Sequence, residues 1–230
     1  MKTLIIYGQN HRGSTYHIAR MIADKAGGEI EEFFLPRDFG EFCTGCCTCF
    51  NDTEKKCPHY DKLAPITGAI DSADVIILAS PVYVFHASGP MKAFLDHYGY
   101  RWMVHSPEEA MFKKQGVCVC TAAGAGMRSA IKDMRHSLFF WGTARIHTLG
   151  LGVAAVDWKG VSGKKMKLIG KKTSKIAEKL VRGCGKVKPG IKTRAVFFGM
   201  HLMQRNGFNP RDAVHWRSHG WTGKKRPWKD

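Results

Sequence analysis

The sequence predicts an α/β fold, a doubly wound parallel sheet of five strands followed by a basic, mainly helical extension. Short apolar runs alternate with amphipathic stretches over residues 1–158, which is typical of parallel strands joined by crossover helices. The runs are apolar almost throughout, as expected of strands buried on both faces. Beyond residue 185 the alternation stops, and the chain becomes rich in Trp and basic residues.

Five strands and five helices are expected in strict alternation. The strands are predicted at 3–8, 29–35, 74–80, 116–122 and 145–151. The helices are predicted at 14–27, 60–71, 89–103, 127–141 and 163–182. In the last helix, apolar residues recur at helical spacing and lysines occupy the other face, which predicts an amphipathic helix. Ligands of such sheets bind at the carboxyl ends of the strands, so the segments after strands 1, 3 and 4 are the candidate site.

The extension is predicted to be a separate unit, with residues 1–185 forming the sheet domain and 186–230 the basic extension. Its apolar and basic stretch at 195–203 is suited to one more helix. Asn209 precedes Pro210, and a capping side chain followed by proline at the first helical position predicts a further short helix there.

Charge is divided unevenly along the chain. Residues 1–158 carry 16 Lys and Arg against 16 Asp and Glu, whereas residues 159–230 carry 20 against 3, a net charge of +17. The sequence contains no run of 18 apolar residues, so a membrane-spanning helix is not expected. The first residues are strand-like, so we expect no signal peptide. We therefore expect a cytoplasmic protein whose eight cysteines are reduced thiols.

The loop after the first predicted strand is a candidate anion site. Small and hydroxyl residues at a helix start present backbone N–H groups to an anion, and the helix dipole adds positive charge there. The alternative is an ordinary helix start capped by Ser14. The loop is neither a P-loop nor a Gly-x-Gly-x-x-Gly dinucleotide loop. The candidate residues are Gln9, Asn10, His11, Gly13, Ser14 and Thr15.

Together with this loop, Ser80-Pro81-Val82-Tyr83 and the segment 88–96 resemble the NAD(P)H-dependent FMN reductases of flavodoxin-like fold. The resemblance covers about residues 1–155. It implies the strand order 2-1-3-4-5, a bound FMN, and NAD(P)H as co-substrate. Gln9-Asn10-His11 replaces the family's usual Ser-Pro-Arg, and the extension has no counterpart in a minimal flavodoxin-like domain.

A flavin ring needs an apolar or aromatic wall and backbone groups for its pyrimidine edge. The segment after strand 3 supplies apolar side chains, and the segment after strand 4 has small side chains that allow close approach of backbone N–H groups. Taken singly, Tyr83 and Phe85 also suit packing under a loop. The candidate ring-binding residues are Pro81, Val82, Tyr83, Val84, Phe85, Thr121, Ala122, Ala123 and Gly124.

Four cysteines with C-x2-C-x2-C-x7-C spacing lie in the segment that follows strand 2: Cys43, Cys46, Cys49 and Cys57. The spacing suits a [4Fe-4S] cluster and resembles that of the iron-sulfur flavoproteins. Two alternatives remain open. One is a loop of free thiols near a dimer interface. The other is a zinc site, although zinc usually takes two separated cysteine pairs.

The favoured function is an NAD(P)H-dependent flavin oxidoreductase that uses bound FMN to pass electrons to a small-molecule acceptor. The alternative is an iron-sulfur flavoprotein that carries electrons between protein partners through FMN and a [4Fe-4S] cluster. A homodimer or higher homo-oligomer is expected. Twenty cations in the last 72 residues suit an anionic partner, but neither nucleic acid nor a membrane is the expected one. We expect the extension to cover the neighbouring subunit or the mouth of the flavin site.

Overall fold

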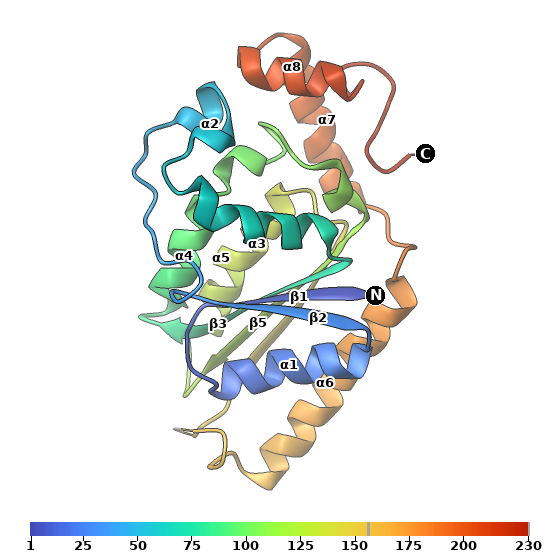
Figure 1. Cartoon of the computed structure of the whole chain (residues 1–230). Coiled ribbons are helices and arrows are strands. Elements are labelled where there is room, and N and C mark those ends of the chain that lie inside the picture. The colour runs from blue at the N-terminus through green and yellow to red at the C-terminus, as the bar shows by residue number, and fades with distance from the viewer. Residues whose placement is uncertain (156, 230) are drawn as a thin grey trace.

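The computed structural model describes residues 1–155 and 157–229 and has the predicted layered architecture (Figure 1). The strands are β1 (Lys2–Tyr7), β2 (Glu29–Phe34), β3 (Val75–Tyr83), β4 (His86–Ala87), β5 (Gln115–Ala122) and β6 (Arg145–Gly152). The α-helices are α1 (Ser14–Ala26), α2 (Thr48–Asn51), α3 (Tyr60–Ser72), α4 (Gly89–Asp96), α5 (Met127–Phe140), α6 (Gly163–Gly183), α7 (Ile191–Arg205) and α8 (Pro210–Ser218). The short 3-10 helices are η1 (Glu54–Lys56), η2 (Gly99–Arg101) and η3 (Glu109–Lys113).

The sheet has the order β2-β1-β3-β5-β6, and each of these pairs is parallel. Since β5 and β6 are the fourth and fifth predicted strands, the order 2-1-3-4-5 is confirmed. The order reverses at β1, so the carboxyl ends of β1, β3 and β5 open at one edge of the sheet.

Two apolar cores cover the two faces of the sheet. In Figure 1, α1 and α6 lie on one side of the sheet, and α3, α4 and α5 lie on the other. Ile5, Ile77 and Val119 point into the first core, whereas Leu4, Ile76 and Cys118 point into the second. Because successive side chains of a strand point to opposite faces, this double burial explains why the central strands β1, β3 and β5 are mostly apolar.

Two predicted elements differ from the structure. The helix predicted at 89–103 ends at Asp96, and η2 follows it at Gly99–Arg101. Strand 3 was expected to end at residue 80 but continues to Tyr83, where it turns back into β4. The extra length of β3 comes from its pairing with β4, at Val82 with Ala87 and at Tyr83 with His86.

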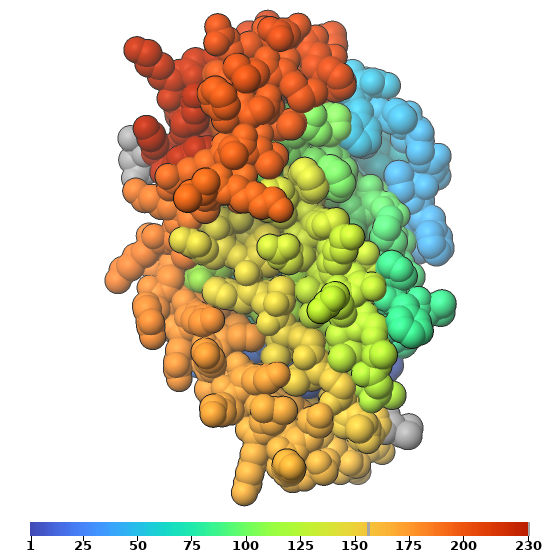
Figure 2. Space-filling view, turned by 180° about the vertical axis from the view of Figure 1, so that it is seen from behind, coloured from blue at the N-terminus to red at the C-terminus, as the bar shows by residue number. Residues whose placement is uncertain are grey.

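The extension is helical, as predicted, and Asn209 caps α8 by accepting hydrogen bonds from the backbone N–H groups of Arg211 and Asp212. Seen from behind, the chain from α6 onward covers one side and the upper end of the molecule (Figure 2). The helices α7 and α8 bury Phe197 and Trp216 against Met103 and Phe112 in a third apolar core. The predicted domain boundary at 185 falls in the connection between α6 and α7, and the division into two domains stays a prediction.

None of the helices in the described residues is long and apolar enough to span a bilayer.

Candidate functional site

The start of α1 has free backbone donors. The N-cap residue is Gly13, which is extended at φ −82° and has no side chain to cap the helix, and Ser14 is the first helical residue. The alternative in which Ser14 caps the helix is therefore wrong. Because the first N–H groups of a helix lack partners within the helix, this start can receive an anion. Gln9 is buried and donates from Nε2 to the His11 carbonyl at 3.2 Å, whereas Asn10 and His11 are exposed.

Two serines fix the first loop against β3 and α4. Ser88 Oγ donates to the Gly8 carbonyl at 2.5 Å, and the Ser88 backbone N–H donates to Ser80 Oγ at 2.9 Å. A Cβ atom on Gly8 would lie 2.5 Å from Ser88 Oγ, so this close approach requires glycine. Sequence reasoning assigned no role to Ser88 or Gly8, although a serine before Gly-Pro is itself a signal for a helix start.

The hairpin between β3 and β4 has a strained and exposed apolar tip. Its two turn residues, Val84 and Phe85, have φ of 47° and 64°, as two-residue hairpin turns require. This conformation normally takes Asn or Gly, and it costs other residues about 1–2 kcal/mol each. Yet Tyr83, Val84 and Phe85 are 48%, 93% and 64% exposed. Apolar side chains held in strained backbone at a surface indicate a functional constraint.

The hairpin is held from α5. The Asp133 carboxylate accepts hydrogen bonds from His86 Nδ1 at 3.0 Å and from the Ala87 backbone N–H at 3.2 Å. Sequence reasoning missed Asp133, since no local pattern connects it to a hairpin 46 residues earlier in the chain.

The loop after β5 joins the other two. Thr121 Oγ1 and Thr15 Oγ1 form a buried hydrogen bond of 2.6 Å between β5 and α1. Gly126 has φ of 91°, and a Cβ atom there would lie 2.6 Å from Val82 Cγ1 of the hairpin. Ala123 and Gly124 are exposed, and Ala122 is half-buried. The structure thus brings the three predicted loops together at the carboxyl edge of the sheet.

This mouth combines an uncapped helix start, an apolar hairpin tip and a loop of small residues. The first suits a phosphate group. The second and third suit a flat ring with a polar edge. The residues present therefore fit a phosphorylated planar cofactor such as FMN.

The cysteine segment lies beside α3, where Cys49 and Cys57 line a small cavity with Tyr60 and Leu63. Cys43, Cys46 and Cys47 are exposed, and Cys49 and Cys57 are half-buried. Burial, and after it the nearby thiols of Cys57, Cys43 and Cys46, raise the pKa of Cys49 to about 11. The hydroxyl of Thr48, which donates to Cys46 Sγ at 3.3 Å, lowers the pKa of Cys46.

The predicted ligands are thus neighbours, but they do not converge on one point. Cys49 and Cys57 line the same small cavity with His97 and Tyr98. Among the described residues, no three or more His, Cys, Asp or Glu side chains form a ready metal site. The metal assignment stays a prediction.

The extension docks beside the cysteine segment. Arg211 of α8 donates from Nε to the Asp52 carbonyl at 2.6 Å and from Nη2 to Glu54 Oε2 at 2.9 Å. Asn209 Nδ2 donates to the Phe50 carbonyl at 3.4 Å. In Figure 1, α8 lies above α2, on the far side of α3 from the sheet. The extension therefore contacts the cysteine segment within its own chain, and this contact had no local sequence signal.

The sequence matches the model of the NADPH-dependent FMN reductase family over residues 1–157. It is 29% identical over 157 residues to an iron-sulfur flavoprotein of Archaeoglobus fulgidus, covering 67% of each chain.

Solved structures share the fold at low identity. Flavone reductase aligns with a TM-score of 0.61 at 14% identity, covering 83% of this chain and 66% of its own. The NAD(P)H:quinone oxidoreductase of Methanothermobacter marburgensis aligns with a TM-score of 0.59 at 15% identity, covering 78% and 96%. An FMN-dependent NADH-azoreductase of Bacillus anthracis, solved with FMN, aligns with a TM-score of 0.58 at 14% identity, covering 79% of this chain and 100% of its own.

At these identities the structural matches establish the flavodoxin-like fold alone. The family match spans more than half of the chain and includes all three loops of the mouth. The chain belongs to the NADPH-dependent FMN reductase family and is an FMN-dependent NAD(P)H oxidoreductase.

Proposed function

We propose that this protein holds FMN in the mouth formed by residues 9–15, 81–85 and 121–124 and passes electrons from NAD(P)H to a small-molecule acceptor. The observation that carries the proposal is the buried hydrogen bond between Thr15 and Thr121. It joins the uncapped helix start to the loop after β5, which supports an anion site next to a surface suited to a ring.

The phosphate of FMN would lie at the start of α1. Gly13 leaves this start without a side-chain cap, so the N–H groups of the first turn and the Ser14 hydroxyl are free to donate. The helix dipole favours the negative charge there. The Thr15 hydroxyl is hydrogen-bonded to Thr121, so its role is to position the two loops.

The ring would lie against the hairpin tip. Tyr83, Val84 and Phe85 are exposed and apolar, while Ala122, Ala123 and Gly124 leave room for backbone donors to reach the ring edge. Bound FMN supplies the hydride and electron chemistry. The chain orients the ring, leaves a face open to NAD(P)H and the acceptor in turn, and limits access of water on the side covered by the hairpin.

The test is FMN binding by the flavin-free protein. Thr15→Val removes the bond between the loops, and Thr173→Val is the matched control, because Thr173 is also buried in a helix and its hydroxyl donates to the Ile169 carbonyl. A hydrogen bond of this kind contributes about 1 kcal/mol, or roughly fivefold in affinity. We expect Thr15→Val to weaken FMN binding by about that factor and Thr173→Val to leave it unchanged. Equal FMN affinities in both variants would contradict the proposed site.

The phosphate and the acceptor need separate measurements. If α1 binds the phosphate, FMN binds at least about tenfold more tightly than riboflavin, since charged hydrogen bonds contribute about 1.5–3 kcal/mol each. Steady-state oxidation of NADH and NADPH with quinone, azo, nitro and ferric acceptors then identifies the substrate class. Reduction of none of them, in a protein that binds FMN, argues for a protein acceptor.

The second candidate is an iron-sulfur flavoprotein that transfers electrons between protein partners. It is favoured by the proximity of Cys43, Cys46 and Cys57 to Cys49, close enough to raise the pKa of its thiol, and by the name of the curated relative. The test is the iron and sulfide content, with the visible spectrum, of protein purified without oxygen. We expect Cys49→Ser to lose a cluster that the adjacent Cys47→Ser retains. Iron-free protein with only a flavin spectrum leaves this candidate without support.

We further propose a homodimer. The extension leaves apolar side chains on its surface: Ile191, Phe198 and Phe208 are 87%, 53% and 63% exposed. Exposed apolar patches of this kind suit a protein interface. Light scattering after size exclusion tests this, and a monomeric mass at micromolar concentration contradicts it. A cytoplasmic location stays a prediction.

A further inference from the structure

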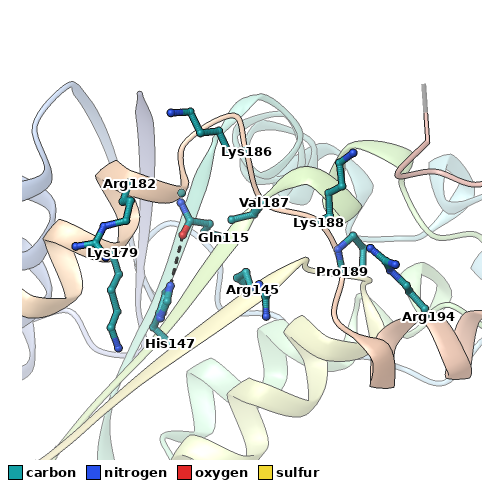
Figure 3. Close-up of a pocket in the computed structure, with 11 residues that line it drawn as sticks. Gln115, Arg145, His147, Lys179, Arg182, Lys186, Val187, Lys188, Pro189 and Arg194 are labelled. Atoms are coloured by element: carbon teal, nitrogen blue, oxygen red, sulfur yellow. Dashed lines mark hydrogen bonds between the residues drawn. The ribbon is translucent and has the colours of Figure 1, made fainter.

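A second, strongly cationic cavity lies at the opposite edge of the sheet from the mouth. It has a volume of about 630 Å³ and is formed by the amino ends of β5 and β6, the end of α6, the connection to α7 and the start of α7 (Figure 3). Its Lys and Arg side chains are Arg145, Lys179, Arg182, Lys186, Lys188 and Arg194. None of the residues that line it is acidic.

These cations carry like charges, and no carboxylate of the described residues pairs with them. Burial lowers the pKa of His147, and the positive charges of Lys179 and Arg145 lower it as well. Six like charges around one cavity repel one another, and a bound anion would relieve that repulsion.

Hydrogen bonds of the buried Gln115 side chain connect the elements at the floor of the cavity. The Gln115 side chain is buried and donates from Nε2 to the Leu180 carbonyl at 2.8 Å, which ties β5 to the end of α6. Its Oε1 lies 3.4 Å from His147 Nε2 on β6, as the dashed line in Figure 3 shows. A Cβ atom on Gly183 would lie 2.7 Å from Gln115 Oε1, so glycine lets α6 close on this floor.

The position of the cavity separates it from the flavin chemistry. Gln115 and Ala122 are the two ends of β5, and a strand of this length spans about 23 Å. A ligand in the cavity therefore does not touch a ring held at the mouth, and hydride transfer needs such contact.

We propose that this cavity binds a small polyphosphate, a chain of three or more phosphates. The volume is that of a small-molecule site, and six permanent cations match the charge of such a chain. Arg and Lys are the residues that bind phosphate oxygens. Apart from the His147 imidazole, the lining contains no aromatic ring on which a base could stack. The site would therefore recognise its ligand through the phosphate groups. Inorganic polyphosphate and nucleoside triphosphates both carry this group.

The test is calorimetric titration of the flavin-loaded protein at physiological ionic strength with tripolyphosphate, ATP and orthophosphate. Arg145→Gln with Lys186→Gln removes two cavity cations, and both residues are exposed, so folding should survive. Lys164→Gln with Lys167→Gln removes two exposed cations of α6 that do not line the cavity. We expect tripolyphosphate to bind with a stoichiometry of one, the cavity variant to lose at least about tenfold in affinity, and the control to stay within about twofold.

Each outcome decides for or against the proposal. Similar affinities for ATP and tripolyphosphate show that the phosphate chain alone is sufficient for binding. Tighter binding of ATP shows that the cavity also recognises the nucleoside. Both results support the site. Equal loss in the control variant shows general surface attraction and overturns it, as does failure of wild-type protein to bind tripolyphosphate. An RNA oligonucleotide that binds with the same affinity to both variants and displaces tripolyphosphate also overturns it. FMN content and NADPH oxidation should be the same in all proteins, which keeps this test independent of the proposed flavin site.

Discussion

The strain in the β3–β4 hairpin leads to a prediction in which stability and function change in opposite directions. Val84 has φ of 47° and is 93% exposed. A β-branched residue pays about 1–2 kcal/mol for this conformation, whereas asparagine adopts it readily. Because Val84 buries almost nothing, Val84→Asn loses little packing. We expect the flavin-free protein to gain about 1 kcal/mol in its free energy of unfolding, or about 2–4 °C in Tm for a chain of this size.

The measurement is urea unfolding of the flavin-free protein, followed by tryptophan fluorescence. Flavin must be removed first, since a ligand that binds only the folded state adds its own stabilisation. Val84→Thr is the matched control, because threonine is also β-branched and keeps the strain. If Val84→Asn is no more stable than Val84→Thr, the backbone at this turn is not strained and the reasoning is refuted.

The same variant should bind FMN less tightly. If Val84 contributes an apolar wall to the ring, its replacement by a polar amide costs about 1 kcal/mol of binding, roughly fivefold in Kd. A more stable protein with unchanged FMN affinity would mean that the hairpin tip does not touch the cofactor. It would leave the strain measurement intact.

Three further substitutions test other parts of the structure. Gly126→Ala forces a Cβ atom to 2.6 Å from Val82 Cγ1 at φ of 91°, and it should cost about 1–2 kcal/mol of stability and weaken FMN binding; normal unfolding and binding would contradict the close approach. Arg101→Met removes the guanidinium that donates two hydrogen bonds to the half-buried Asp71 carboxylate and should cost about 2 kcal/mol in urea unfolding; a neutral effect would show that the pair is not needed. Burial lowers the pKa of His215 from 6.5 to about 4, so the unfolded chain binds the extra proton and stability falls as the pH drops from about 6.5 towards 4, by up to about 3 kcal/mol. His215→Gln should flatten this part of the pH profile, and an unchanged profile would place the titration elsewhere.

The sequence by itself determined the layered sheet and the position of the mouth. Continuous apolar runs such as 75–80 identify strands buried on both faces, and the crossover rule places the segments after strands 1, 3 and 5 of the structure at one edge. Asn209 before Pro210 also identified the start of α8 correctly. In each case the signal is local, because periodicity, capping and turn chemistry depend on residues close together in the chain.

Tertiary structure alone decided the extra length of β3, the strained turn and the docking of the extension. Val84 adopts positive φ because β4 pairs with β3 and Asp133 holds the hairpin. Arg211 meets Glu54 across 157 residues of sequence, and the cationic cavity collects side chains from β6, α6 and α7. Such contacts depend on which distant segments bury apolar surface and pair charges with one another. A short stretch of sequence does not contain that information.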